Sequence, residues 1–277
     1  MKFISVPYFF CVVFFLFSFS MKAQIDTFSH ELSTKNTDSF IKGAKIPEFS
    51  FYLPGKAGDI KFGLIQGDTS VWLSDLHSTC TSFKTGLKYL ISGSILKQGK
   101  LIFIALPLFQ TDGLIIQIQG EQLPKGIQLF WAFGGASGKL ISQSNPGLMD
   151  VDCHDNVCIR ERNAEILYYP TIPKFNVFHA LFPIQTQSEI SDAKQQKSPL
   201  SFAHSGKETD VPAFTGLFLL QNGMKYYVAL YRPSNAFDVN YYMLPFIFKT
   251  LETKKETVEK KKKNNHQSQL IIKLNLK

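Results

Sequence analysis

The chain has 277 residues, of which 44% are hydrophobic and 19% are charged. This composition excludes a largely disordered protein, because a chain of this length and apolar content buries a core of ordinary domain size. The formal net charge is +8, but residues 249–277 hold nine lysines and three glutamates, Lys2 and Lys22 supply the rest, and residues 24–248 are neutral. A neutral central region excludes the broad basic surface with which a folded domain binds nucleic acid or an anionic membrane.

Residues 1–23 have the pattern of a signal peptide. Lys2 gives a positive start, residues 3–20 form an uncharged apolar segment, and Ala23 offers a small side chain at a cleavage point before Gln24. We therefore expect an exported protein, periplasmic or extracellular, with no stable membrane span after cleavage. The alternative is a retained membrane anchor, for which the apolar segment is near the lower length limit.

The next stretch, residues 24–44, is polar and without periodicity, and it is predicted to be a flexible leader. Over residues 45–248, short apolar runs alternate with Gly, Pro, Asp and Asn, which is typical of strands joined by turns. Strands are predicted over residues 48–53, 60–65, 70–74, 87–93, 100–106, 113–119, 126–133, 165–169, 176–182, 214–220, 224–231 and 240–248.

Alternation within these runs assigns faces to the strands. In residues 126–133, every second side chain is large and apolar, from Ile127 to Phe133, which predicts a core-facing side. Asn222 and Gly223 predict a β-hairpin over residues 214–231, because Asn-Gly tolerates the positive φ of tight reversals. About a dozen strands exceed one ordinary sheet, so the predicted fold is all-β, an antiparallel two-sheet β-sandwich; a closed barrel is the alternative.

Two segments interrupt the strand pattern. Residues 184–212 are polar with few bulky apolar side chains, and we predict a long surface insertion there. Residues 249–265 are charged and helix-prone, with Leu251 and Val258 seven apart on one face. Residues 249–277 are therefore interpreted as a charged linker helix and tail.

Three cysteines remain after signal cleavage: Cys80, Cys153 and Cys158. In an oxidising compartment, Cys153 and Cys158 could close a short loop, although either could instead pair with Cys80. The sequence leaves the pairing open, with one thiol over.

Motifs for cofactors and metals fail on their spacing. The string from Gly134 to Lys139 resembles a phosphate-binding loop. However, three residues rather than four separate Gly134 from Gly138, and Leu140 stands after the Lys where the loop requires Ser or Thr. Asp150, Asp152 and Glu161 match positions one, three and twelve of an EF-hand loop, but Asp155 stands where the loop requires Gly. A structural zinc site would need a second ligand pair. No cofactor and no metal site are predicted.

Signals for a catalytic nucleophile are equally poor. The sequence has no Gly-x-Ser-x-Gly elbow, Cys80 has no activating neighbour along the chain, and the six histidines are scattered. No catalytic residue is predicted.

Aromatic side chains remain as candidates for binding a sugar ring. Trp72 shares a strand face with Ser70 and Ser74, so its ring is a candidate stacking platform; shielding of an edge strand is the alternative. Tyr52 and Tyr227 are weaker candidates, as is Tyr242. Trp131, by contrast, lies on the predicted core face.

Two longer stretches resemble a known family. They are IPEFSFYLPGKAGDIKFGLIQGDTSVWL (residues 46–73) and GKLIFIALPLFQTDGLIIQIQGEQLPKGIQLFWAFGGASGK (residues 99–139), of which FWAFGGASGK is the most distinctive part. They are similar to the N-terminal region of large exported bacterial proteins grouped as domain of unknown function 4450, and the similarity runs from residue 46 to about residue 248. Members tend to accompany polysaccharide-degrading systems, and the rest of their sequence is similar to six-hairpin, (α/α)6-barrel glycosidases.

This resemblance implies that the chain is an N-terminal β-supersandwich domain and that residues from 249 onward stand where a linker helix leads into the barrel. It assigns no catalytic residue, because the carboxylates of such architectures usually come from the barrel. We expect a truncation or frameshift in the run from Lys260 to Lys263, which would make the final residues non-native.

Three functions from different classes follow. The first is a non-catalytic sandwich domain that supports a glycosidase barrel absent from this chain, in polysaccharide degradation. The second is a free-standing carbohydrate-binding module, with Trp72 at its surface and a polysaccharide or oligosaccharide as ligand. The third, a small complete hydrolase, requires a pocket with converging reactive groups.

Overall fold

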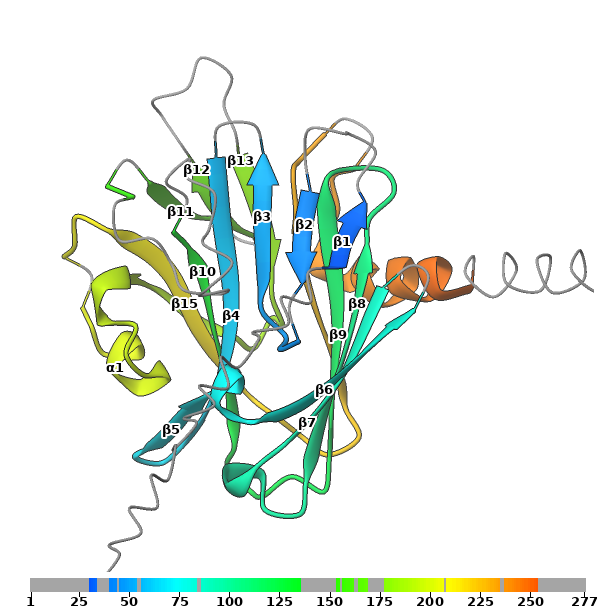
Figure 1. The fold of residues 1–277 in the computed structure, drawn as a ribbon. Helices are drawn as coiled ribbons and strands as arrows, with labels where there is room; N and C mark the ends of the chain where they lie inside the picture. The colour runs from blue at the N-terminus through cyan, green and yellow to red at the C-terminus, as the bar shows by residue number, and fades with distance from the viewer. Residues whose placement is uncertain are drawn as a thin grey trace, which may run out of the picture.

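The computed structural model describes residues 30–33, 40–43, 45–53, 56–83, 86–135, 153–154, 156–161, 164–168, 177–206, 208–234 and 237–253. These residues form two eight-stranded antiparallel sheets that pack face to face (Figure 1). The predicted two-sheet β-sandwich is confirmed.

Sheet A contains the strands at the start of the described chain and three later ones. In spatial order it comprises β1 (His30–Ser33), β2 (Phe40–Gly43), β3 (Phe49–Leu53), β4 (Lys56–Gln66), β10 (Gln128–Gly134), β15 (Pro212–Leu219) and β14 (Gln187–Asp192), with β5 (Thr69–Trp72) paired to β4.

Sheet B contains four consecutive strands that form a meander, extended on one side by four later strands. Its order is β11 (Val157–Glu161), β12 (Ala164–Tyr168), β13 (Val177–Leu181), β16 (Lys225–Tyr231), β9 (Gly113–Glu121), β8 (Lys100–Pro107), β7 (Gly86–Ser92) and β6 (His77–Phe83). Short helical turns η1 (Leu73–Asp75) and η2 (Ser94–Leu96) follow β5 and β7.

The central core lies between the two sheets and is built by strict alternation. On β4, Ile60, Phe62 and Leu64 are buried in this core, whereas Asp59 and Lys61 point to the other side of sheet A. Ring contacts cross the gap between the sheets, such as Phe62 of β4 edge-on to Phe103 of β8, with centroids 5.3 Å apart.

The predicted hairpin over residues 214–231 is wrong, although the predicted tight turn is present. β15 pairs within sheet A and β16 within sheet B, so the turn between them carries the chain from one sheet to the other. Gly223 has a φ of 76°. Asn222 accepts a hydrogen bond from the backbone of Leu123 (2.6 Å), and Gly223 donates one to Gly120 (2.9 Å). These bonds attach the turn to the end of β9 and to the β9–β10 connection. In a hairpin, β15 and β16 would instead pair with each other.

Three other sequence-based predictions are corrected. The expected leader contains β1 and β2, and the expected insertion at 184–212 contains β14, the turn η3 (Ala193–Gln195) and helix α1 (Pro199–Ala203). The expected strand at 240–248 is the turn η4 (Tyr241–Met243) followed by a helix over residues 244–253. Its buried residues Leu244, Phe248 and Leu251 are four and three apart, which is the helical period.

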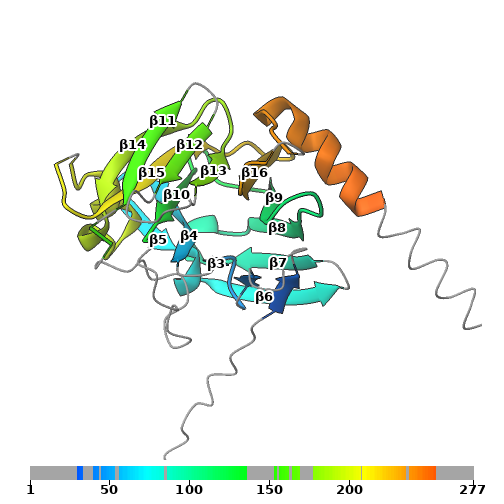
Figure 2. The same ribbon diagram turned by 90° about the horizontal axis from the view of Figure 1, so that it is seen from above.

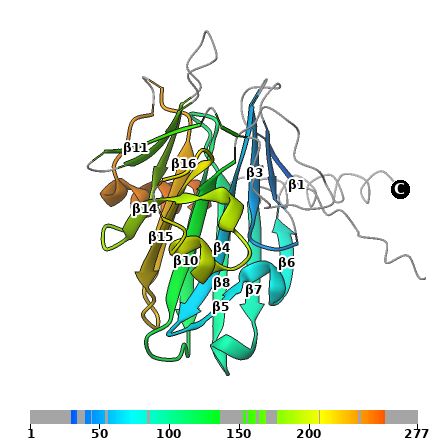
Figure 3. The same cartoon turned by 90° about the vertical axis from the view of Figure 1, so that its left-hand side faces the viewer.

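Both outer faces of the sandwich are covered by later parts of the chain. On sheet A the cover is residues 193–205, which include α1 and are called the strap below; Figure 3 shows α1 in front of β15 and β10. On sheet B the cover is the helix over 244–253, drawn in orange in Figure 2 beside β16, β9 and β8. Each cover buries an apolar cluster separate from the central core.

We predict that Gly216→Ala on β15 lowers the free energy of unfolding by about 1–3 kcal/mol, because overpacking strains a close-packed core. An added Cβ would lie 2.4 Å from the Cζ2 atom of Trp131, whose ring is held by stacking on Phe182 with centroids 3.4 Å apart. Urea denaturation gives the loss. Trp131→Phe removes the clashing atom, so Gly216→Ala should cost less in that background; strictly additive losses would contradict this explanation.

Candidate functional site

Trp72, the leading candidate from the sequence, lies at the centre of the cluster on the outer face of sheet A. Its side chain is only 5% exposed. The ring packs edge-on against Phe130 of β10 and Phe202 of α1, with centroids 5.7 and 6.5 Å away. Its indole N–H donates to the carbonyl of Gln196 in the strap at 3.1 Å. Because no open ring face remains, this position fits shielding of the short strand β5 and does not fit stacking on a sugar.

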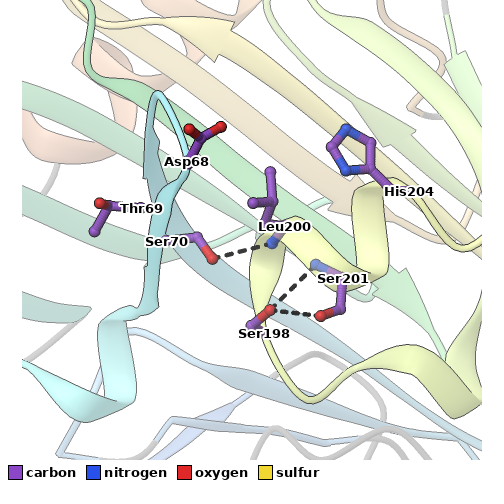
Figure 4. Close-up of a pocket in the computed structure, with 7 residues that line it drawn as sticks. All are labelled: Asp68, Thr69, Ser70, Ser198, Leu200, Ser201 and His204. Atoms are coloured by element: carbon purple, nitrogen blue, oxygen red, sulfur yellow. Dashed lines mark hydrogen bonds between the residues drawn. The ribbon is translucent and has the colours of Figure 1, made fainter.

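The strap beside Trp72 borders a polar groove of about 520 Å³. The groove runs between the β4–β5 turn and α1 and is lined by Asp68, Thr69, Ser70, Ser198, Leu200, Ser201 and His204 (Figure 4). Three of its hydroxyls already hold the strap. Ser70 accepts from the backbone of Leu200 at 3.2 Å, and Ser198 caps α1 by accepting from Ser201 N at 3.1 Å while its Oγ lies 2.8 Å from Ser201 Oγ.

Serine, histidine and aspartate in one groove suggest a hydrolytic triad, but the geometry does not assemble one. In Figure 4 the ring of His204 lies apart from Ser198 and Ser201. Among the described residues, no hydrogen bond joins His204 to a serine hydroxyl or to Asp68, whereas nucleophilic catalysis requires both links. The groove is therefore the seam along which the strap meets the β4–β5 turn.

A cluster of buried charged groups lies on the same outer face of sheet A. Phe49 of β3 lies opposite Ile60 of the antiparallel strand β4. Continuing this register by one residue places Glu48 opposite Lys61. Glu48, Asp59 and Lys61 are all buried. Ser50 donates a hydrogen bond to Asp59 at 2.6 Å, and the ammonium of Lys61 lies 4.1 Å from the centroid of the Trp72 ring, a cation–π contact.

Burial raises the pKa of Glu48 to about 7, against the attraction of Lys61 and a hydrogen bond with Ser74. Burial also lowers the pKa of Lys61, against the attraction of Glu48, Asp59 and Asp75. Within the described part of the chain, no donor reaches Oε1 of Glu48. An ionised carboxylate that is buried with one oxygen lacking a donor is costly, so both the geometry and the raised pKa favour a neutral Glu48 at mildly acidic pH.

The remaining sugar-binding candidates are placed differently. Tyr227 is buried under the C-terminal helix, where its ring packs on Phe248 with centroids 5.7 Å apart and its hydroxyl accepts from Gln117 at 3.1 Å. Tyr52 is in β3, but its side chain is outside the described residues. Trp72 and Tyr227 lie on opposite outer faces of the sandwich, so they do not form one aromatic platform.

No disulfide joins Cys153 to Cys158 in the structure, so the suggested bridge is not formed. Cys153 is buried in the cluster outside sheet A, whereas Cys158 packs against the central core between the sheets. The two side chains that would close the loop thus belong to different apolar clusters.

Most of the candidate metal and phosphate motifs cannot be placed. Asp150, Asp152 and Asp155 are outside the described residues, as is the string after Gly135, and only the backbone of Glu161 is described. Within the described ranges, no three His, Cys, Asp or Glu side chains gather as metal ligands would. No helix in this part of the chain has the length and apolar content to cross a bilayer.

The C-terminal helix and the turn before it are apolar on two sides. One side, with Leu244, Phe248 and Leu251, is buried on sheet B. The other side exposes large apolar groups: Tyr242 is 78% and Phe246 is 73% exposed, and Met243 is also exposed. Large apolar groups that are exposed together usually mark a contact surface, so the turn and the start of this helix form a candidate interface that the sequence pattern did not reveal.

We expect Trp72→Ala to lower the free energy of unfolding by about 3–5 kcal/mol, because it empties the cluster under the strap. Chemical denaturation measures the loss. Tyr242→Ala, at an exposed aromatic, is the matched control and should change stability by less than about 0.5 kcal/mol. A Trp72→Ala protein of unchanged stability would contradict a packing role for this ring.

Glu48 gives stability a defined dependence on pH. A carboxyl whose pKa rises from 4.5 to about 7 on folding makes the folded state bind more protons than the unfolded one. Its stabilising contribution is therefore complete below about pH 4.5 and lost by about pH 7, a change of about 3 kcal/mol. Urea denaturation from pH 4.5 to 8 should show this decline relative to Glu48→Gln, in which the slope is removed. If the free energies of unfolding of the two proteins changed with pH in parallel, folding would not alter the pKa of Glu48, and the prediction would be wrong.

Comparison with known proteins places this fold. The model of the family described as Domain of unknown function (DUF4450) matches residues 53–252. A search of curated proteins gave no significant match. A bacterial glucoamylase complexed with acarbose is similar in structure, with a TM-score of 0.51 and 12% identity over 79% of this chain and 34% of the other. The α-N-acetylgalactosaminidase NagBb from Bifidobacterium bifidum, in complex with GalNAc, gives a TM-score of 0.46 and 11% identity over 75% of this chain and 36% of the other.

The chain spans about a third of the length of these two enzymes. At 12% identity, the likeness to the glucoamylase shows a common fold and carries no residue roles across. The family match covers well over half of the sequence and agrees with the similarity of residues 46–73 and 99–139. The chain belongs to the DUF4450 family.

Proposed function

We propose that this protein is an exported, non-catalytic β-sandwich domain that supports a glycoside-hydrolase barrel of the (α/α)6 type in polysaccharide degradation. The observation that carries the proposal is the helix over residues 244–253 and the turn before it, which bury one apolar side on sheet B and expose another with Tyr242, Met243 and Phe246. The exposed side is where the barrel would dock.

Sheet B exposes further apolar side chains on its outer face. Leu90 on β7 is exposed on the outer side of sheet B, as are Val157 and Ile159 of the edge strand β11. Large apolar side chains that are exposed on one face of a soluble domain often mark a surface that binds a partner. The exposed Phe246 is the best placed to act as an anchor, because aromatic side chains contribute most to the affinity of protein interfaces.

The comparisons are consistent with a supporting role. This sandwich corresponds to about a third of a larger glucoamylase, so the rest of such an enzyme has room for the catalytic machinery. Because the chain spans about a third of that enzyme's length, the proposal places the barrel directly downstream in the gene, either as a continuation of the chain or as a separate polypeptide. Export remains part of the proposal and rests on the pattern of residues 1–23.

The free-standing carbohydrate-binding module is the weaker function. Trp72 and Tyr227, two of its proposed ring platforms, are buried, and the groove beside Trp72 uses its serine hydroxyls to hold the strap. A small complete hydrolase would need reactive groups in contact, which the described groove does not bring together.

The test begins with the DNA that follows the codon for Lys277, which we expect to encode a barrel. The protein from Gln24 onward should not hydrolyse aryl glycosides or oligosaccharides by itself. It should bind the barrel, and Phe246→Ser should weaken this binding by about tenfold or more, as loss of an aromatic anchor does. Binding is measured by isothermal titration calorimetry.

Lys197→Ser, which changes an exposed polar position in the strap on the opposite outer face of the sandwich, is the matched control and should leave the affinity unchanged. Hydrolysis by the sandwich alone, downstream DNA without a barrel in any frame, or equal affinity of the Phe246→Ser protein would each overturn the proposal.

A further inference from the structure

The buried charges on sheet A connect directly to the strap. Lys61 is placed between two alternatives: the carboxyl of Glu48, which immediately precedes the neighbouring strand β3, and the ring of Trp72. In the structure its ammonium lies over the ring, 4.1 Å from the centroid, and among the described residues no ion pair joins it to Glu48. Trp72 in turn donates to Gln196 in the strap and packs against Phe202 of α1.

We propose that loss of the proton from Glu48 draws Lys61 away from Trp72 and loosens the strap, so that residues 193–205 form a pH-sensitive cover on sheet A. With Glu48 neutral, Lys61 remains over the ring and the strap is seated. With Glu48 ionised, its Oε1, which has no donor within the described structure, attracts the ammonium, and Trp72 loses the cation–π contact. In this mechanism, a change of charge at Glu48 shifts the strap between a seated and a loosened arrangement.

Charged groups around this pair set the direction of the response. Asp59 on β4 and Asp75 in η1 both attract the ammonium of Lys61, against the burial that lowers its pKa, while Asp75 also opposes ionisation of Glu48. The raised pKa of Glu48, about 7, supports a transition near neutral pH. The strap is accordingly expected to be seated in acid and looser in base.

The strap has other titratable neighbours, which the test must separate from Glu48. Lys194 forms an exposed ion pair with Asp210 at 2.7 Å, and Nδ1 of His154 lies 3.3 Å from the same carboxylate. His204 lies in the strap itself. Because histidines titrate in the same pH range, a variant with His154→Gln and His204→Gln serves as the background for every comparison.

Two measurements test the proposal in the full mature chain. Trp131→Phe leaves Trp72 as the single tryptophan, since the sequence has two, and its emission is followed from about pH 5 to 9. A transition near pH 7 is expected, and Glu48→Gln, a neutral isostere, should abolish it and keep the acid spectrum. Glu189→Gln, at an exposed carboxyl on β14 of the same sheet, should leave the transition in place.

Hydrogen exchange of residues 193–205 needs no change at Trp131, so it decides the case even if that variant fails to fold. After correction for the intrinsic pH dependence of exchange, the strap should open about tenfold more readily above the transition than below it, as expected for loss of a desolvated cation–π contact. Glu48→Gln should remove this difference. A transition that persists unchanged in Glu48→Gln, or strap exchange that is independent of pH in the parent protein, overturns the proposal.

Discussion

Side chains alternate across a β-strand, so every strand that fills the space between two sheets also presents residues on the outside of the sandwich. In this protein many of those outward residues are large and apolar. Trp72 and Phe130 lie outside sheet A, and Tyr227 and Tyr231 lie outside sheet B. The sandwich therefore requires a cover on each outer face, and the strap and the C-terminal helix provide it.

The two covers differ in what they leave exposed. The strap is short, and its exposed residues, among them Lys194, Lys197 and His204, are polar. The C-terminal helix and its preceding turn bury one side and present Tyr242, Met243 and Phe246 on the other. This difference is why the face of sheet B is the proposed docking surface and the face of sheet A is not.

Sheet A carries an additional feature, because its outward positions near β3 hold charged groups in place of apolar ones. Glu48, Asp59 and Lys61 are buried, and Lys61 lies against the buried ring of Trp72. Desolvation then disfavours their ionised forms, and the cation–π contact with Trp72 gives the lysine an alternative to the carboxylate. A structural role for Trp72 and a sensitivity to pH are two results of one arrangement.

The sequence by itself determined the fold class, most strands, the core position of Trp131 and the positive φ of Gly223, because alternation and turn chemistry are local properties. It did not reveal that Asn222 and Gly223 join two sheets, that the helix predicted from residue 249 already begins at residue 244, or that polar runs such as β6 and β14 complete the sheets. Those features depend on which strand finds which neighbour, and that choice is made by contacts between residues far apart in sequence. The same reason explains Trp72: its face was assigned correctly from its neighbours, but a strap more than a hundred residues later decides whether that face is open.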